Sequence, residues 1–172
     1  ALELDIVQRL KGVSFLCGMD YASKDVYDFS CKINRFEHSV NVARITWRFT
    51  KDKKATIAAL MHDIATPVFS HVIDYMNGDY IKQESTEEKT YEILNSSEEF
   101  KKCIKEDNIK IEEISDFKRY SIVDNERPNL CADRLDGTLL SAMAWANIVD
   151  ARCCEQILKS LIVGKNEDDE KL

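Results

Sequence analysis

The chain has 172 residues, 44% of them hydrophobic and 32% charged, which predicts one globular domain with a substantial core. Its 24 Lys and Arg against 31 Asp and Glu give a net charge of −7. This argues against nucleic acid as the main partner, because nucleic-acid-binding proteins usually present a basic face.

The sequence shows no membrane-length apolar run and no opening signal segment, so we expect a cytoplasmic location and no membrane partner. Only five Gly and two Pro interrupt the chain, which favours long helices and predicts an all-α fold. Hydrophobic periodicity predicts helices over residues 2–13, 36–50, 53–64, 69–76, 83–94, 96–105, 109–117, 130–148 and 151–163. We expect a single domain over residues 1–163, followed by a polar, flexible tail over residues 164–172.

Residues 14–34 lack periodicity and predict a long irregular connection, and such loops are often functional. In the helix that follows, His38 falls in line with Val42 and Ile45 on the inward side. A histidine in that place needs a polar partner, because burying it unsatisfied is costly. Trp47 and Trp145 stand at core spacing and are expected in the interior.

The helix over residues 53–64 is expected to end at Pro67, with His62 and Asp63 in its last turn. Neighbouring side chains on a helix point about 100° apart, but two of them can still converge on an ion just off the helix. After the break, His71 and Asp74 are i, i+3 partners on one helix face.

The three histidines of the chain, His38, His62 and His71, lie within one short span and alternate with carboxylates. Imidazole together with carboxylate suits a divalent metal of intermediate hardness, so we predict a metal site. For each residue alone a structural role stays open. His38 would be a satisfied core histidine, and Asp133 a helix-start acid. The other structural roles are surface ion pairs of Arg35 with Glu37 and of Arg134 with Asp136, a turn closed by Asp74, and a solvated helix start at Glu84.

The order His38, His62-Asp63, Asp133 on a helical domain resembles the H…HD…D pattern of the HD superfamily of metal-dependent phosphohydrolases. Three local segments are similar to its deoxynucleoside triphosphate triphosphohydrolase branch: RFEHS at 35–39, HDIATPVFSH at 62–71 and ADRLD at 132–136. The resemblance implies a compact HD-domain helical bundle. It also implies an enzyme that uses metal-activated water to cleave a phosphoester or phosphoanhydride of a small phosphorylated substrate, with a nucleotide favoured.

The resemblance also implies roles for individual residues. The metal ligands would be His38, His62, Asp63 and Asp133. The cofactor would be one divalent ion among Mn, Fe, Co, Ni, Zn and Mg. The catalytic group would be His71, Asp74 and Glu84, and substrate phosphate would bind Arg35 and Arg134, whose guanidinium forks suit phosphate. A homo-oligomer is left open.

Several positions depart from the pattern of that branch. Thr66 replaces a histidine, Ala65 a glycine and Gln83 the histidine of a His-Glu pair, while Gly137 and Ser141 replace a tyrosine and an aspartate that meet the sugar. These changes leave the metal ligands untouched, and they motivate an alternative: a degenerate HD module that binds metal or nucleotide as a regulator without turnover. A purely structural metal is a third alternative, but four protein ligands leave open positions on an octahedral ion, which favours catalysis.

Overall fold

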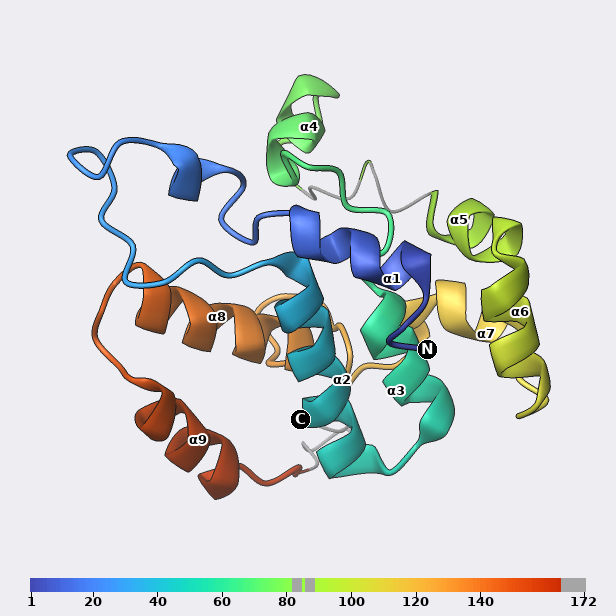
Figure 1. The fold of residues 1–172 in the computed structure, drawn as a ribbon. Coiled ribbons are helices and arrows are strands. Elements are labelled where there is room, and N and C mark those ends of the chain that lie inside the picture. Colours follow the sequence, from blue (N-terminus) through green and yellow to red (C-terminus); the bar gives the residue numbers. More distant parts are fainter. Residues whose placement is uncertain (82–84, 86–88, 165–172) are drawn as a thin grey trace.

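The computed structural model describes residues 1–81, 85 and 89–164, and this part of the chain is helical without any strand, as predicted. The helices, shown in Figure 1, are α1 (Asp5–Gln8), α2 (Arg35–Thr50), α3 (Lys53–Met61), α4 (His71–Met76), α5 (Thr90–Ser96), α6 (Glu98–Lys105), α7 (Ile111–Ser115), α8 (Ala132–Ala144) and α9 (Ala151–Ser160). Short 3₁₀ helices cover Arg9–Gly12, Met19–Tyr21 and Phe117–Arg119.

The helices predicted over residues 109–117 and 130–148 are observed as the shorter α7 and α8, and two other predicted helices differ further. The helix expected over residues 2–13 breaks after α1 into a 3₁₀ turn, where Val13 N–H donates to the Leu10 carbonyl. Apolar spacing could not distinguish these helix types, because Val7, Leu10 and Val13 are buried in either. Helix α3 ends at Met61, so His62 follows the helix instead of standing in its last turn. Part of the helix expected over residues 83–94, and all but the first residue of the tail expected over residues 164–172, lie outside the described residues.

Helix α2 is the centre of the fold and packs against both α3 and α8 (Figure 1). Its start is fixed by a capping box in which Asn34 Oδ1 accepts from Glu37 N–H at 2.9 Å and Glu37 Oε2 accepts from Asn34 N–H at 3.1 Å. This start sets the rotation of the helix. Arg35 and His38 in its first turn are therefore buried, together with Val42 and Ile45 further along.

The segment over residues 14–34 is irregular, as predicted, apart from its 3₁₀ turn and an isolated antiparallel bridge between Ser14 and Asn34. It crosses to the far end of α8 (Figure 1), where Ser30 N–H donates to the Ala144 carbonyl at 3.0 Å and Ser30 Oγ donates to the Met143 carbonyl at 3.0 Å. These bonds tie the long connection to the C-terminal end of α8. Asp133 stands in the first turn of the same helix.

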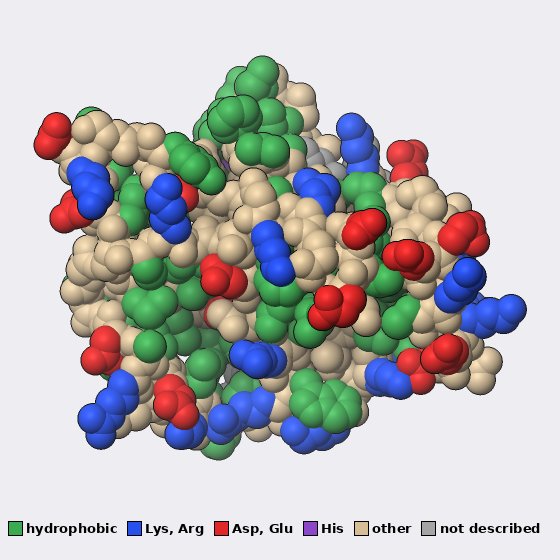
Figure 2. Space-filling view, in the orientation of Figure 1, with side chains coloured by type: hydrophobic (Ala, Val, Ile, Leu, Met, Phe, Trp, Pro, Cys, Tyr) green, Lys and Arg blue, Asp and Glu red, His purple; other side chains and the backbone are tan. Residues whose placement is uncertain are grey.

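Helix α4 stands away from the rest of the fold (Figure 1). Hydrophobic side chains gather over it in Figure 2, and those exposed on and just before the helix are Val68, Phe69, Val72, Tyr75 and Met76. The expectation that Trp47 and Trp145 are core residues is wrong, since both are about half exposed. Each lies near the end of its helix, where apolar spacing no longer guarantees burial. Within the described part of the chain, no helix is long and apolar enough to cross a membrane.

Candidate metal centre

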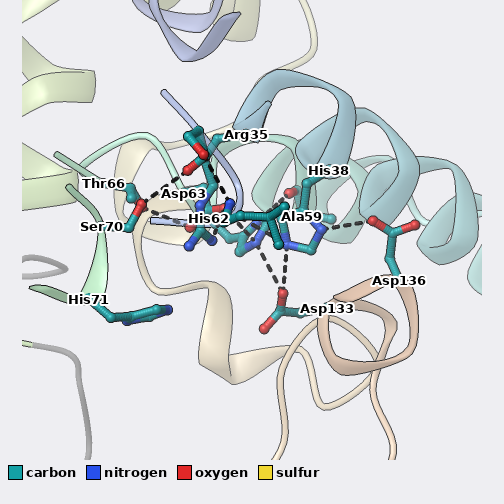
Figure 3. Close-up of polar contacts among 12 residues, drawn as sticks. Arg35, His38, Ala59, His62, Asp63, Thr66, Ser70, His71, Asp133 and Asp136 are labelled. Carbon is teal, nitrogen blue, oxygen red and sulfur yellow. Dashed lines mark hydrogen bonds and ion pairs between the residues drawn. The ribbon is translucent and has the colours of Figure 1, made fainter. Parts of the chain in front are cut away.

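Three elements bring two histidines and a carboxylate together (Figure 3). His38 stands in the first turn of α2, His62 directly follows α3, and Asp133 stands in the first turn of α8. One potential ligand atom from each of these residues lies within 4.8 Å of the other two. Both histidines are buried and Asp133 is partly buried, and all three line one cavity.

His38 lies between two carboxylates of α8. Its Nδ1 is 2.7 Å from Asp136 Oδ2, and its Nε2 is 2.8 Å from Asp133 Oδ1. An ionised carboxylate only accepts hydrogen bonds, so both ring nitrogens donate in this arrangement. A cation could take the place of the Nε2 proton, while Asp136 would keep the proton on Nδ1 and hold the orientation of the ring. Carboxylates commonly orient metal-binding histidines in this way.

His62 presents a buried nitrogen with no hydrogen-bond partner among the described residues. Its Nδ1 donates to the Ala59 carbonyl at 2.7 Å, which leaves Nε2 with the free lone pair when the ring is neutral. That Nε2 is buried, and the nearest carboxylate oxygen of Asp133 is 3.5 Å away, longer than a good hydrogen bond. An unsatisfied buried polar atom costs free energy, so the orphaned nitrogen points to a cation as its partner.

The donor set and its spacing fit a divalent ion. Nitrogen and oxygen ligands stand about 2.0–2.2 Å from Zn²⁺, so ligand atoms around one such ion are about 3–4 Å apart. Asp133 Oδ1 is 2.8 Å and 3.5 Å from the Nε2 atoms of His38 and His62, close to that range. Imidazole suits Zn, Fe and Ni, whereas Mg²⁺ prefers oxygen ligands and is the poorest match among the ions expected from the sequence.

Asp63, the fourth predicted ligand, lies beside this group but has other partners. Its Oδ2 accepts from Arg35 Nη1 at 2.9 Å, and its Oδ1 accepts from Thr66 Oγ1 at 2.8 Å. Oδ2 is also 3.8 Å from His38 Nε2 and 3.6 Å from His62 Nε2. Among the described residues, the mutually close ligand atoms come from the two histidines and Asp133, so ligation by Asp63 stays a proposal.

The charged side chains around His62 shift one another's pKa values. Burial lowers the pKa of His62, but the carboxylates of Asp63 and Asp133 raise it more, to about 9. Burial raises the pKa of Asp63, but the Arg35 guanidinium and His62 lower it more, to well below its usual range. The pKa of Asp133 is also well below its ordinary value, because His38 and His62 outweigh burial. Both carboxylates are therefore ionised, as cation binding requires.

The two predicted phosphate-binding arginines line the cavity, but both already have partners. Arg35 is buried, with Nη1 bonded to Asp63 and its guanidinium 5.1 Å from the Phe15 ring centroid. Arg134 Nη1 donates to the Asn129 carbonyl, and its Nη2 donates to the Asn125 carbonyl at 2.9 Å. These contacts hold the connection before α8 against the helix. Contact of either arginine with phosphate stays a proposal.

The predicted catalytic residues lie apart from the histidine cluster. His71 Nδ1 donates to Asp74 Oδ2 at 3.0 Å, and Ser85 Oγ donates to Asp74 Oδ1 at 2.7 Å. Asp74 is buried, whereas the His71 side chain is 45% exposed and lines the cavity. Figure 3 shows the His71 ring separated from the His38 and His62 rings. Glu84, the third predicted catalytic residue, lies outside the described residues.

The cavity that joins these groups has a volume of about 1160 Å³. That is enough for a small phosphorylated molecule, since ligand sites commonly measure about 300–1,000 Å³. One wall is formed by α8 and Trp145 just after it, and another by the connection over residues 117–127. Phe15 and Phe117 pack on the histidine rings, with centroids 4.9 Å from His38 and 5.9 Å from His62 respectively.

Sequence reasoning missed three residues of the site. Asp136 is the partner of His38 Nδ1, and its i+3 spacing from Asp133 was the available signal. Thr66, noted only as a substitution, bonds Asp63 Oδ1. Arg9 donates from Nη2 to the Ile64 and Thr66 carbonyls at 2.7 Å and 3.0 Å, which secures the chain just after His62 and Asp63. Nothing local to Arg9 predicts this contact.

The helical fold and the cluster define a class of protein: a helical domain whose two buried histidines and α8 carboxylate could hold a divalent metal. Residues 35–136 match the family described as the HD domain, which is more than half of the chain. The chain therefore belongs to the HD domain family.

Two curated relatives are similar to the chain. The uncharacterized protein YdhJ of Bacillus subtilis is 28% identical over 148 residues, which are 83% of this chain and 42% of the relative. The metal-dependent phosphohydrolase cns2 of Cordyceps militaris is 27% identical over 146 residues, 83% of this chain and 39% of the relative. The chain thus spans about two fifths of the length of these relatives. No solved structure is significantly similar to it.

Proposed function

We propose that this chain carries the active site of a divalent-metal-dependent phosphohydrolase, with His38, His62, Asp63 and Asp133 as metal ligands. The observation that carries the proposal is the buried Nε2 of His62, which has no hydrogen-bond partner among the described residues and lies beside His38 and Asp133 in a cavity. Membership of the HD family supports it, as does similarity to a protein named as a metal-dependent phosphohydrolase.

A bound divalent ion would polarise a phosphoryl oxygen and lower the pKa of water near it. The side chains of the chain itself would bind, orient and move protons. Asp136 holds the His38 ring, and Arg35 keeps Asp63 ionised. Asp74 fixes the proton of His71 on Nδ1, which leaves Nε2 free to take up or give a proton at the cavity wall.

The substrate we propose is a small phosphorylated molecule, and a nucleotide is favoured. Four cationic side chains line the cavity and can offset phosphate charge: Arg35, Lys118, Arg127 and Arg134. The segments at 35–39, 62–71 and 132–136 resemble the deoxynucleoside triphosphate triphosphohydrolase branch, which supports a nucleotide substrate.

A second candidate is a regulatory HD module that binds metal or nucleotide without turnover. It is favoured by Thr66, whose hydroxyl bonds Asp63 Oδ1 at a position where the resembled branch carries a histidine. It is also favoured by the two arginines, which are engaged by Asp63 and by backbone carbonyls.

The test is elemental analysis of the purified protein, paired with phosphate release from a panel of nucleotides and phosphoesters. The panel is repeated with Mn, Fe, Co, Ni, Zn and Mg. Near-stoichiometric metal with turnover is the expected result. Bound metal without turnover on any substrate would favour the regulatory module, and absence of metal binding would overturn both the hydrolase and a metal-binding regulator.

A further inference from the structure

One face of α8 runs along the cavity from the metal cluster to a tryptophan. Cavity-lining residues follow at intervals of four positions: Asp133, Gly137, Ser141 and Trp145. With a rise of about 1.5 Å per residue, the twelve steps from Asp133 to Trp145 cover about 18 Å. The cavity wall formed by α8 is therefore long in one direction. Near its Asp133 end lies the buried His62 Nε2, which lacks a hydrogen-bond partner in the part of the chain that the structure describes.

In the middle of this wall the side chains are small and project little from the helix. A Cβ added at Gly137 would already be in van der Waals contact with Phe15 Cζ, at 3.6 Å, so a large side chain there would collide with the Phe15 ring or displace it. Ser141, one turn further, also lines the cavity with a short side chain. We call the groove bounded by Asp133, Gly137, Ser141 and Trp145 the α8 trough.

The far end of the trough is aromatic. Trp145 is 50% exposed, and the Phe29 ring meets it edge-on with centroids 6.3 Å apart. Tyr27 stacks on Phe29 at 5.8 Å. The hydrogen bonds of Ser30 to the end of α8 hold this segment in place, so the rings form an ordered group. An exposed tryptophan in such a group can cover a planar ring.

The two ends of the trough therefore differ: one carries carboxylates, imidazoles and arginines together with the Phe15 and Phe117 rings, and the other is formed by the aromatic rings of Trp145 and its neighbours. We infer that the α8 trough binds an elongated phosphorylated molecule, with its phosphoryl group at the His38–His62–Asp133 end and a planar aromatic group against Trp145. This inference rests on the proposed function and makes Trp145 a specificity-determining residue. A nucleoside polyphosphate has this architecture, whereas a small sugar phosphate would leave Trp145 uncovered.

The chain has only two tryptophans, which allows a direct test. In a W47F protein, Trp145 is the only tryptophan and its fluorescence reports on the trough. The probes are the non-hydrolysable β,γ-imidotriphosphates of adenosine, guanosine, cytidine and uridine, with inorganic tripolyphosphate as the ring-free control, all in the presence of Zn²⁺. We expect at least one nucleoside analogue to change Trp145 emission and tripolyphosphate to leave it unchanged.

Three variants extend the test to affinity, measured by calorimetry. Trp145→Leu should weaken the responding analogue by about tenfold, the size expected for loss of one stacked ring, and leave tripolyphosphate binding unchanged. Trp47→Leu is the matched control and should change neither. Ser141→Leu, which fills the trough, should weaken the analogue and spare tripolyphosphate.

The outcomes separate the two proposals. Metal-dependent tripolyphosphate binding with no Trp145 response to any nucleoside analogue would overturn the trough inference alone. Equal responses to tripolyphosphate and to the analogues would also overturn it, since the ring would then not be the cause. Failure of tripolyphosphate and all analogues to bind in the presence of metal would contradict the proposed function as well.

Discussion

Two histidine–carboxylate pairs of similar chemistry lie in very different surroundings. His38 is 1% exposed and bonds Asp136 between two long helices, α2 and α8. His71 is partly exposed and bonds Asp74 within α4, a helix of six residues that stands away from the fold (Figure 1). The first pair is fixed by tertiary packing, and the second by local spacing along one short helix.

The difference indicates a division of labour. The proposed metal ligand His38 needs a fixed position, and the buried pair provides one, because α2 packs against α8 and a capping box sets the start of α2. A group that exchanges protons needs access to substrate and solvent, and the pair on α4 has that at the cavity wall. Changes at the two pairs should therefore separate metal binding from proton transfer.

The largest effect is expected from His62→Ala. Loss of the cation would remove several kcal/mol of transition-state stabilisation, so phosphate release should fall by at least about 1000-fold and bound metal should be lost.

His71→Ala should keep the metal and lower turnover by about 100-fold or more, as expected for a lost general acid or base. Elemental analysis with phosphate-release kinetics checks both variants. Metal retained at full occupancy in His62→Ala would refute the assignment of the ligand.

The buried cluster also predicts a pH dependence of the metal-free protein. The pKa of His62 is raised to about 9 from an ordinary value of 6.5, so its charged form stabilises the fold. That contribution is complete below pH 6.5 and is lost as pH rises through 9, by up to about 3 kcal/mol.

Urea unfolding of the metal-free protein between pH 6.5 and 9.5 measures this loss. His71→Asn should show the same loss of stability as the unchanged protein, because His71 lies outside the cluster. His62→Asn should show much less of it. A stability that is flat across this range in the unchanged protein would show that the two carboxylates do not hold a charged His62.

A matched pair of isosteric changes compares the two carboxylates directly. Asp136→Asn should lower metal affinity by about 10–100-fold, because an amide cannot hold the His38 ring and its Nδ1 proton as a carboxylate does. Asp74→Asn makes the same chemical change on α4 and should leave metal affinity unaltered. Competition with a chromophoric chelator measures both metal affinities. Equal losses of metal affinity in the two variants would contradict the proposed difference between the pairs.

The smallest effect is expected at Ser70, which precedes α4. Its φ of 46° and ψ of −127° strain a residue with a side chain, and its side chain does not cap the helix. Ser70→Gly should relieve this strain, partly offset by the greater freedom of Gly in the unfolded chain, for a net gain of about 0.5 kcal/mol. The shift of the urea midpoint measures it, with metal content as the control. A loss of stability would show that the Ser70 contact with the Ser14 carbonyl matters more than the strain.

Much of the fold was predictable because its signals are local. Periodicity placed α2, and Pro67 predicted a break after α3, although the helix ends earlier than expected, at Met61, and leaves His62 and Asp63 beyond it. The inward direction of His38 followed from its alignment with Val42 and Ile45, and all three are buried.

The rest depends on contacts between distant segments. Asp136 meets His38 across 98 positions, and Arg9 reaches the Ile64 carbonyl across 55. Local spacing does not indicate the Arg9 contact, and the i+3 spacing of Asp136 from Asp133 does not identify His38 as its partner. Trp145 was misplaced in the core for a related reason: its exposure depends on where α8 ends and on how the segment over residues 14–34 returns to it.

The long sequence separation of the cluster also has a consequence for synthesis of the chain. A nascent chain that has emerged only through α3 contains His38 and His62, but the carboxylates that meet His38 follow 95 and 98 positions after it. Closing loops of that length costs chain entropy before the contacts form. The proposed metal-binding group is therefore completed only after α8 has left the ribosome and docked on α2, and until then His38 lacks both of these carboxylate partners.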